Sequence, residues 1–302
     1  MANLRKIYIG AVCNRDLKVL ENIKEFLKLN YNISIINLLK NNIESFDPNS
    51  FKKRLKKYPI SFLIVKLTTQ KSNKNIYKVI RNVSPNIPIL NSLSSVQICE
   101  SRTNTFNLIK NACKKIQIPL TYNTKQDAWK ACQEGTNIIV KLDSHNIPAL
   151  PKKDRIIGIA RNSNELGKLI ENYKECDLFF QEYLGEHDII YKVYVIGNWV
   201  VSITSYNRLQ KNKDLSPLEL IHIRVPVDER FKRRIIRLGR NFGMSIFGLD
   251  YIMTEKGPYI VDVNDFPSFR SIPEGVSLVS DHIYNLINMR EIYQNTFIRA
   301  KS

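Results

Sequence analysis

The chain has 302 residues, of which 43% are hydrophobic, and it carries a formal net charge of +18 at pH 7. This length and apolar content exclude a disordered chain and exceed the usual size of one compact domain, so we expect two or three subdomains. No segment approaches the roughly 18 to 20 consecutive apolar residues of a membrane-spanning helix, and the start is too short and interrupted for a secretory signal. We therefore expect a cytoplasmic monomer with no membrane partner.

The first 90 residues alternate between strand-like and helix-like segments. Apolar strand-like runs occupy 7–12, 33–38 and 60–67, and stretches with helical periodicity separate them. This alternation predicts a small parallel α/β domain, whose ligand crevice lies beyond the carboxyl ends of its strands. Lys66 lies at such an end and is a candidate ligand-binding residue, although an ordinary lysine with a buried alkyl stem fits the position equally well.

Two helical segments are expected next. The stretch 94–119 reads as helical, with Arg102 near the start of its long helix and Pro119 as its end. A further helix is expected over 124–133, because a glycine follows it as a stop signal.

Lys141 ends the next predicted strand, 137–141. A loop at 142–154 follows, which contains His145, two further lysines and two prolines, and it leads into a strand at 155–160. A loop of this kind between two strands can fold over a phosphate group.

A predicted hairpin follows the strand at 177–184. Its two strands, IIYKVYVIG and NWVVSITSY, are joined through Gly197 and Asn198, a pair that suits a tight turn. Strand alternation places Lys192 and Tyr194 on one face, opposite the valines between and beside them. We therefore expect Lys192 to face a cleft.

An amphipathic helix is predicted over 228–242, with Asp228 as its N-cap and Gly243 as its stop. Its apolar residues recur at helical spacing and form the expected buried stripe, namely Phe231, Ile235, Leu238 and Phe242.

The segment GLDYIMTEKGPYIVDVNDFP carries the most informative polar residues. Asp250 lies in one strand of a predicted hairpin, and Asp262 and Asn264 lie two positions apart on the other, so they project to the same face. Apolar neighbours indicate that these strands are buried, and acids in a buried strand need a partner. Oxygen donors of this kind suit Mg²⁺ that bridges the outer phosphates of a nucleotide.

The net charge, the cysteines and the histidines restrict further which ligands the protein can bind. The positive charge favours the capture of anions. Five cysteines and four histidines are scattered without the spacings of a zinc site, a disulfide framework or a helical metal site. The densest basic runs, 52–57 and 232–240, are typical of solvated helix faces.

These segments together resemble the ATP-grasp fold, and the likeness is greatest to the inositol 1,3,4-trisphosphate 5/6-kinase (inositol-tetrakisphosphate 1-kinase) family. The Asp-x-Asn hairpin, the QEYL strand with a lysine a few residues on, and the strand-end lysine of IIVK carry it, in the family's order from about residue 60 to 286. The resemblance implies an α/β fold with α+β elements: an N-terminal Rossmann-like pre-grasp domain at 1–92, a central ATP-grasp subdomain at 93–184, and a C-terminal ATP-grasp subdomain with the metal site at 185–302.

The resemblance also implies roles for matching residues, with ATP and Mg²⁺ as cofactors. Metal ligands would be Asp250, Asp262 and Asn264, and catalytic roles fall to Lys192 and Asp262. The nucleotide-binding residues would be Arg102, Lys141, Gln181, Glu182, Leu184, Asp188 and Lys192. The residues that would bind a phosphorylated inositol are Lys66, His145, Arg208, Ser268 and Arg270.

Departures from the family's pattern fall mainly on the substrate side. The loop after Lys141 lacks the family's glycine, the family's Arg-Pro-Ser is replaced by Ser-Tyr-Asn with Arg208 just beyond, and Ser268 replaces a glycine after the last Phe-Pro. These differences leave the implied ATP and magnesium sites intact. They leave open which inositol phosphate is the substrate.

Three functions are compatible with the sequence. The first is an ATP-dependent inositol phosphate kinase, which the KVYVIG strand and Lys66 favour. The second is a RimK-like ATP-grasp ligase that joins a carboxylate to an amine through an acyl phosphate, although such ligases often carry glutamate at the position of Asp262. The third is nucleic-acid binding, which we disfavour because aromatic residues are not interleaved with the basic ones as stacking platforms.

Overall fold

The computed structural model describes residues 6–39, 46–145, 147, 155–207, 209 and 221–299, and for 290–299 it describes the backbone alone. Three β-sheets organise the chain, two of four strands and one of five. None of the helices in these ranges is long and apolar enough to cross a membrane. All five cysteines are free thiols.

The N-terminal sheet is parallel, with the strand order β2-β1-β3-β4. Its strands are β1 (Ile7–Cys13), β2 (Ile33–Asn37), β3 (Ile60–Lys66) and β4 (Ile89–Leu90). The helices between them are α1 (Leu17–Tyr31), α2 (Pro48–Lys57) and α3 (Asn73–Val83). The last five residues of β1 and of β3 are buried, as expected for central strands covered on both faces. The predicted Rossmann-like α/β arrangement is therefore confirmed.

Two helices, α4 (Leu93–Ile98) and α5 (Arg102–Ala112), replace the single helical segment expected over 94–119. The break has a local cause, because the Ser101 side chain accepts a hydrogen bond from the backbone N–H of Asn104 and so starts a new helix. Arg102 is consequently the first residue of α5. The expected end at Pro119 is wrong by several residues, since α5 ends at Ala112.

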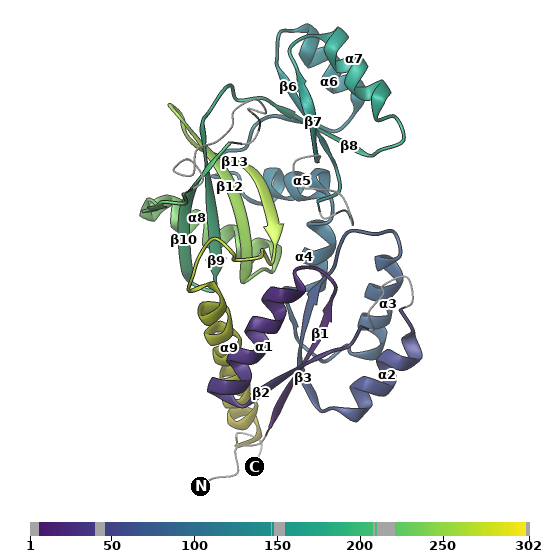
Figure 1. Cartoon of the computed structure of the whole chain (residues 1–302), viewed down its shortest axis with the longest axis vertical. Coiled ribbons are helices and arrows are strands. Elements are labelled where there is room, and N and C mark those ends of the chain that lie inside the picture. Colours follow the sequence, from purple (N-terminus) through teal and green to yellow (C-terminus); the bar gives the residue numbers. More distant parts are fainter. Residues whose placement is uncertain are drawn as a thin grey trace.

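The second sheet is antiparallel and has the order β5-β8-β6-β7. Its strands are β5 (Thr121–Tyr122), β6 (Ile138–Leu142), β7 (Ile156–Ala160) and β8 (Leu178–Glu182). The helices α6 (Lys125–Gln133) and α7 (Ser163–Asn172) pack on it through a small core of their own. Figure 1 shows this unit at one end of the molecule.

The third sheet is also antiparallel, with the order β11-β10-β9-β12-β13. Its strands are β9 (Ile189–Ile196), β10 (Trp199–Tyr206), β11 (Arg224–Val225), β12 (Ile246–Thr254) and β13 (Gly257–Asp265). Helix α8 (Glu229–Phe242) covers one face, begins at the N-cap Asp228 and ends at Gly243. The predicted stripe of α8 packs against inward residues of the sheet, among them Val193, Leu249 and Val263. On the opposite face, Tyr194, Ile196 and Ile246 pack into a core shared with the N-terminal sheet, and polar side chains occupy the rest of the face.

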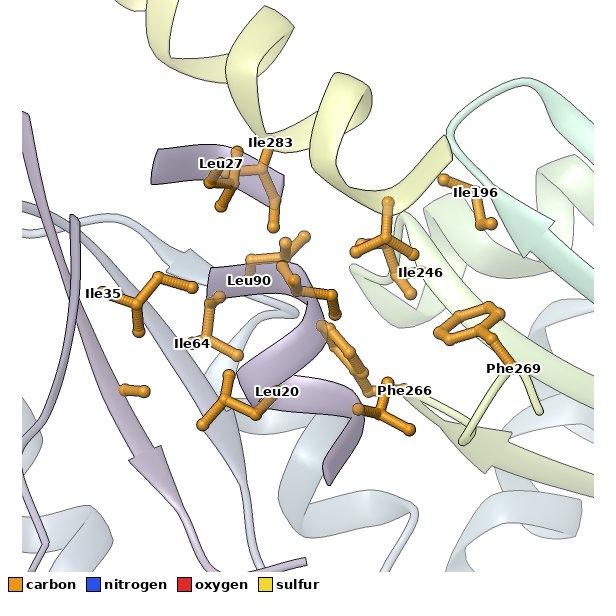
Figure 2. Packing of buried hydrophobic residues seen from close by; sticks show 14 of the residues in the cluster. Leu20, Leu27, Ile35, Ile64, Leu90, Ile196, Ile246, Phe266, Phe269 and Ile283 are labelled. Carbon is orange, nitrogen blue, oxygen red and sulfur yellow. The ribbon is translucent and has the colours of Figure 1, made fainter. Parts of the chain in front are cut away.

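One apolar core joins the N-terminal sheet to the five-stranded sheet. Helix α9 (Gly275–Arg299) runs beside α1 (Figure 1), and Leu27 of α1 lies close to Ile283 of α9. Figure 2 shows Ile64, Phe266 and Ile196 along this core, and all three belong to one cluster of buried hydrophobic residues. The two sheets are therefore held in a fixed relation, which positions residues from both at one site.

Candidate functional site

Three predicted site residues lie in one row across three adjacent strands. Asp250 of β12 is paired in register with Lys192 of β9 on one side and with Asp262 of β13 on the other. Asn264 lies two positions beyond Asp262, so it projects to the same face, opposite Gly248. Because the alternate residues of these strands are buried beneath α8, this polar row lies on the face opposite α8.

A β-bulge next to this row links the site to the second sheet. Asp250 pairs with Asp262 but Tyr251 pairs with Ile260, which leaves Val261 without a partner on β12. The Lys141 ammonium donates a hydrogen bond to the carbonyl of Val261 at 3.1 Å. The strand-end lysine of β6 is thereby fixed against the strand that carries Asp262.

Asp262 lies at the centre of the polar cluster. Its Oδ1 is 3.4 Å from Arg102 Nε and 3.5 Å from His145 Nε2, and its Oδ2 accepts a hydrogen bond from the Asn264 amide at 3.3 Å. Burial opposes ionisation, but His145, Arg102, Lys141 and the Asn264 amide outweigh it and lower the pKa of Asp262 to about 2. Asp262 is therefore a carboxylate at neutral pH.

The Oδ1 atom of Asp262 fits a cation site. It is buried and accepts no hydrogen bond of good geometry from any described residue. Buried carboxylate oxygens normally have such a partner, so an oxygen without one is suited to a ligand. Among the described residues, no group of three or more His, Cys, Asp or Glu side chains is arranged to hold a metal ion. Two carboxylates and an amide suit Mg²⁺ better than a transition metal.

Backbone contacts hold Arg102 beside Asp262. Its guanidinium donates hydrogen bonds to the carbonyl of Leu142 and, at 3.2 Å, to that of Ser144. The carboxylate of Asp143 accepts from both the N–H and the hydroxyl of Thr103, at 2.8 and 2.7 Å. The start of α5 is thus docked on the chain that leaves β6. Asp143 was not singled out from the sequence, where only its position two residues after Lys141 hinted at a role.

His145 is buried in the same cluster. Burial, with the nearby Arg102 charge, lowers its pKa to about 3, so its imidazole is neutral at physiological pH. Its backbone N–H donates to the carbonyl of Glu100 at 3.2 Å. Of the predicted loop 142–154, residues 142–145 and 147 belong to the described chain, so its two lysines lie outside it.

The residues matched to the nucleotide lie along β8 and the segment after it. The Lys141 ammonium donates to the Gln181 side-chain oxygen at 2.8 Å, and both side chains are buried. Burial lowers the pKa of Lys141 to about 8. Glu182 accepts from the N–H of Leu120 at 3.0 Å. Leu184 is partly buried just beyond β8, and Asp188 is exposed.

The residues matched to the acceptor lie near the end of β13. The Lys66 ammonium is 3.2 Å from the carboxylate of Asp16, and the Arg270 guanidinium is 3.4 Å from the same carboxylate. Ser268 is partly buried in the loop between them. Arg208 lies outside the described residues. Asp16 was not predicted as a site residue, because nothing local to its sequence distinguishes it from an ordinary helix cap.

Comparisons with known proteins were made for the whole chain. No family model matches it. The sequence is similar to that of inositol-tetrakisphosphate 1-kinase from Xenopus laevis, with 22% identity over 306 residues that cover 87% of this chain and 77% of the relative.

Several solved structures are similar to the chain. A RimK domain ATP-grasp protein from Sphaerobacter thermophilus has 12% identity and a TM-score of 0.63, covering 92% of this chain and 99% of that one. The D-alanine–D-alanine ligase from Bacillus anthracis complexed with ATP has 14% identity and a TM-score of 0.63, covering 95% and 99%. The ATP-grasp ligase PsnB, in a complex with a minimal precursor, Mg and ADP, has 14% identity and a TM-score of 0.63, covering 94% and 98%.

These structural matches show that the chain has the ATP-grasp fold, as its sequence predicted. Within that fold, its sequence is similar to that of an inositol-tetrakisphosphate 1-kinase.

Proposed function

We propose that this protein is an ATP- and Mg²⁺-dependent inositol polyphosphate kinase, which transfers the γ-phosphoryl group of ATP to a hydroxyl of a phosphorylated inositol. The observation that carries the proposal is the row formed by Lys192, Asp250 and Asp262 on adjacent strands. It combines two carboxylates for a cation with a lysine on one face of a sheet, and all three residues are partly buried. Similarity to the Xenopus laevis kinase supports this acceptor class.

We assign the metal to the oxygens of Asp250, Asp262 and Asn264. The buried Oδ1 of Asp262, which is near Arg102 but accepts no hydrogen bond of good geometry, supports this assignment, and Mg²⁺ is present in the PsnB complex of the same fold. When bound, Mg²⁺ supplies positive charge to the outer phosphates of the nucleotide.

Phosphoryl transfer requires positioning and positive charge more than covalent chemistry from the protein. The bond between the γ-phosphorus and the bridging oxygen of ADP breaks, a bond to the acceptor oxygen forms, and the hydroxyl proton leaves. Lys141 and Lys192 offset the negative charge on the transferring group from two sides. The neighbouring Gln181, Glu182, Leu184 and Asp188 hold the nucleoside, with Arg102 beside the phosphates.

The acceptor is held on the other side of the metal residues. Lys66 and Arg270 meet at Asp16, Ser268 lies in the same loop as Arg270, and His145 lies beside Asp262. Because His145 is neutral, it offers a hydrogen bond and not a charge. No side chain is assigned as a general base, since a hydroxyl aligned by cations can lose its proton late in the reaction.

A carboxylate–amine ligase is the alternative, and it is favoured by a different observation, because the matched solved structures include the D-alanine–D-alanine ligase and PsnB. In that reaction the phosphoryl group would pass to a carboxylate oxygen, and an amine would then displace phosphate from the acyl phosphate. The nucleotide and metal residues would keep their roles. The two functions differ only in what accepts the phosphoryl group.

One assay separates the two functions. Purified protein with ATP and Mg²⁺ is offered single inositol phosphates in one series and carboxylate–amine pairs in another, and ADP and inorganic phosphate are both measured. A kinase releases ADP without inorganic phosphate, and the mass of the acceptor rises by one phosphate. Release of both products only when an acid and an amine are present would refute the kinase and support the ligase.

A further inference from the structure

Asp16 has an unfavourable local structure at the start of α1. Its backbone is left-handed, with φ 53° and ψ 45°, and its side chain makes no capping hydrogen bond to α1. Asp47 and Asp228, the N-caps of α2 and α8, both accept hydrogen bonds from the N–H groups of their helices. A left-handed non-glycine residue and an unused cap each cost stability. The conformation of Asp16 is therefore maintained by contacts elsewhere.

The Asp16 carboxylate contacts two cations, Lys66 and Arg270, which were matched to the acceptor. Lys66 Nζ lies 3.2 Å from one carboxylate oxygen of Asp16, and Arg270 Nη2 lies 3.4 Å from the other. The carboxylate thus occupies the space between a lysine at the end of β3 and an arginine in the loop after β13.

The surroundings of Lys66 leave little capacity for another anion. Its side chain is 3% exposed. Besides Asp16, its ammonium donates to the carbonyl of Pro267 at 3.3 Å and lies 5.0 Å from the centre of the Phe266 ring. An ammonium has three protons, and these three neighbours surround it. A phosphate that bound Lys66 would have to displace Asp16.

Arg15, the residue just before Asp16, is a third cation that is paired with a carboxylate. Arg15 lies 3.1 Å from a carboxylate oxygen of Asp265. On this wall of the site, the three described cations Lys66, Arg270 and Arg15 therefore face two carboxylates. The wall as a whole is not negative, but the Asp16 carboxylate lies between Lys66 and Arg270, where it repels a phosphate that approaches its oxygens and can accept a hydrogen bond from a hydroxyl.

We infer that Asp16 is a specificity-determining residue for the acceptor. Its carboxylate accepts a hydrogen bond from a free hydroxyl of a polyol phosphate and excludes a phosphate group from that position. The acceptor is accordingly a phosphorylated inositol that keeps a free hydroxyl at this one position, where inositol hexakisphosphate carries a phosphate. This inference rests on the proposed function, because it places the acceptor beside Lys66 and Arg270.

The test compares the binding of inositol hexakisphosphate and inositol monophosphate to the wild type and to Asp16→Asn by calorimetry. A saturating non-hydrolysable ATP analogue with Mg²⁺ blocks the nucleotide site. The buffer is held near pH 6.5 so that Lys66, whose pKa burial lowers to about 8, stays charged. We expect Asp16→Asn to bind the hexakisphosphate about tenfold more tightly and the monophosphate no more tightly than the wild type.

Asp47→Asn is the matched control, because it removes the same charge from an N-cap that does cap its helix. It should leave the ratio of the two dissociation constants unchanged. An equal ratio in Asp16→Asn and the wild type would overturn the inference, as would a hexakisphosphate bound less tightly by Asp16→Asn. If neither compound bound to the wild type or to either variant, the proposed function would be refuted as well. This outcome distinguishes a failure of the proposed function from a failure of the inference alone.

Discussion

Arg15 binds Asp265 across 250 positions of the chain. Its guanidinium donates to the backbone carbonyl of Asp265 at 2.9 Å and to both carboxylate oxygens at 3.1 and 3.2 Å. The two side chains are 11% and 5% exposed. Since Asp265 directly follows Asn264, this pair attaches the turn after β1 to the strand that carries the proposed metal ligands. The N-terminal sheet therefore forms one wall of the site.

A double-mutant cycle on this pair tests that attachment. Arg15→Met and Asp265→Asn should each destabilise the protein by about 3–5 kcal/mol, because each leaves a buried charge without its partner. The double variant should lose clearly less than the sum, since no charge is then left alone. Urea denaturation followed by circular dichroism gives the three free energies of unfolding.

The exposed pair between Lys24 and Glu21 is the control for this cycle. Its side chains are 43% and 55% exposed, so its coupling energy should stay within about 0.5 kcal/mol. Additive losses at Arg15 and Asp265 would show that the two residues stabilise the protein independently of each other.

Local patterns in the sequence were sufficient for most of the secondary structure and for the hairpin of β12 and β13. Strand alternation alone predicted that Asp262 and Asn264 share a face, and helical spacing predicted which residues of α8 are buried. These features depend on periods of two and of about 3.6 residues, which a single sequence displays. The positions of Asp262 and Asp250 opposite one another follow from one short hairpin.

Contacts between distant segments could not be predicted in this way. Nothing near Asp16 in the sequence indicates that its carboxylate meets Arg270, because that contact depends on how two sheets pack. The sequence also gives no sign of the bulge at Val261, since a bulge removes one residue from the register without changing the apolar pattern. The hairpin could therefore be predicted from the sequence. The charged residues beside it were found only in the structure.

The shared core predicts that the N-terminal sheet and the five-stranded sheet unfold together. Ile283→Ala on α9 removes a fully buried side chain next to Leu27 of α1 and should cost about 2–5 kcal/mol. Thermal unfolding followed by calorimetry should keep a single transition at a lower temperature. Leu29→Ala, at a residue that is 82% exposed, should change stability by less than about 0.5 kcal/mol. Two separated transitions in Ile283→Ala would contradict this coupling.

Asp262→Asn should abolish ATP turnover and keep the fold. The substitution preserves the shape of the side chain but removes the charge that the proposed Mg²⁺ site and Arg102 both require. We expect ADP release to fall by about 10²–10³-fold or more, with an unchanged circular dichroism spectrum. Asp177→Asn changes an exposed carboxylate just before β8 and should retain activity. Full activity of Asp262→Asn would show that the metal binds elsewhere.

Nucleotide affinity should decrease as the pH rises through about 8, and Lys141 should be the cause. Burial lowers the pKa of this lysine to about 8, so its ammonium is largely charged near pH 7 and largely neutral near pH 9. We expect the dissociation constant of a non-hydrolysable ATP analogue with Mg²⁺ to rise about tenfold across that range. Because the bound phosphates favour the charged form, binding near pH 8 should also take up a proton. Calorimetry in buffers of different ionisation enthalpy measures that uptake.

Lys66 offers a matched control for Lys141, because burial lowers its pKa to about 8 as well. Lys141→Met should bind the nucleotide weakly, with little pH dependence and no proton uptake. Lys66→Met should keep the wild-type pH dependence and the uptake, since Lys66 contacts Asp16 on the acceptor side and not the proposed nucleotide residues. If Lys66→Met lost the uptake and Lys141→Met kept it, the assignment of Lys141 to the nucleotide phosphates would be wrong.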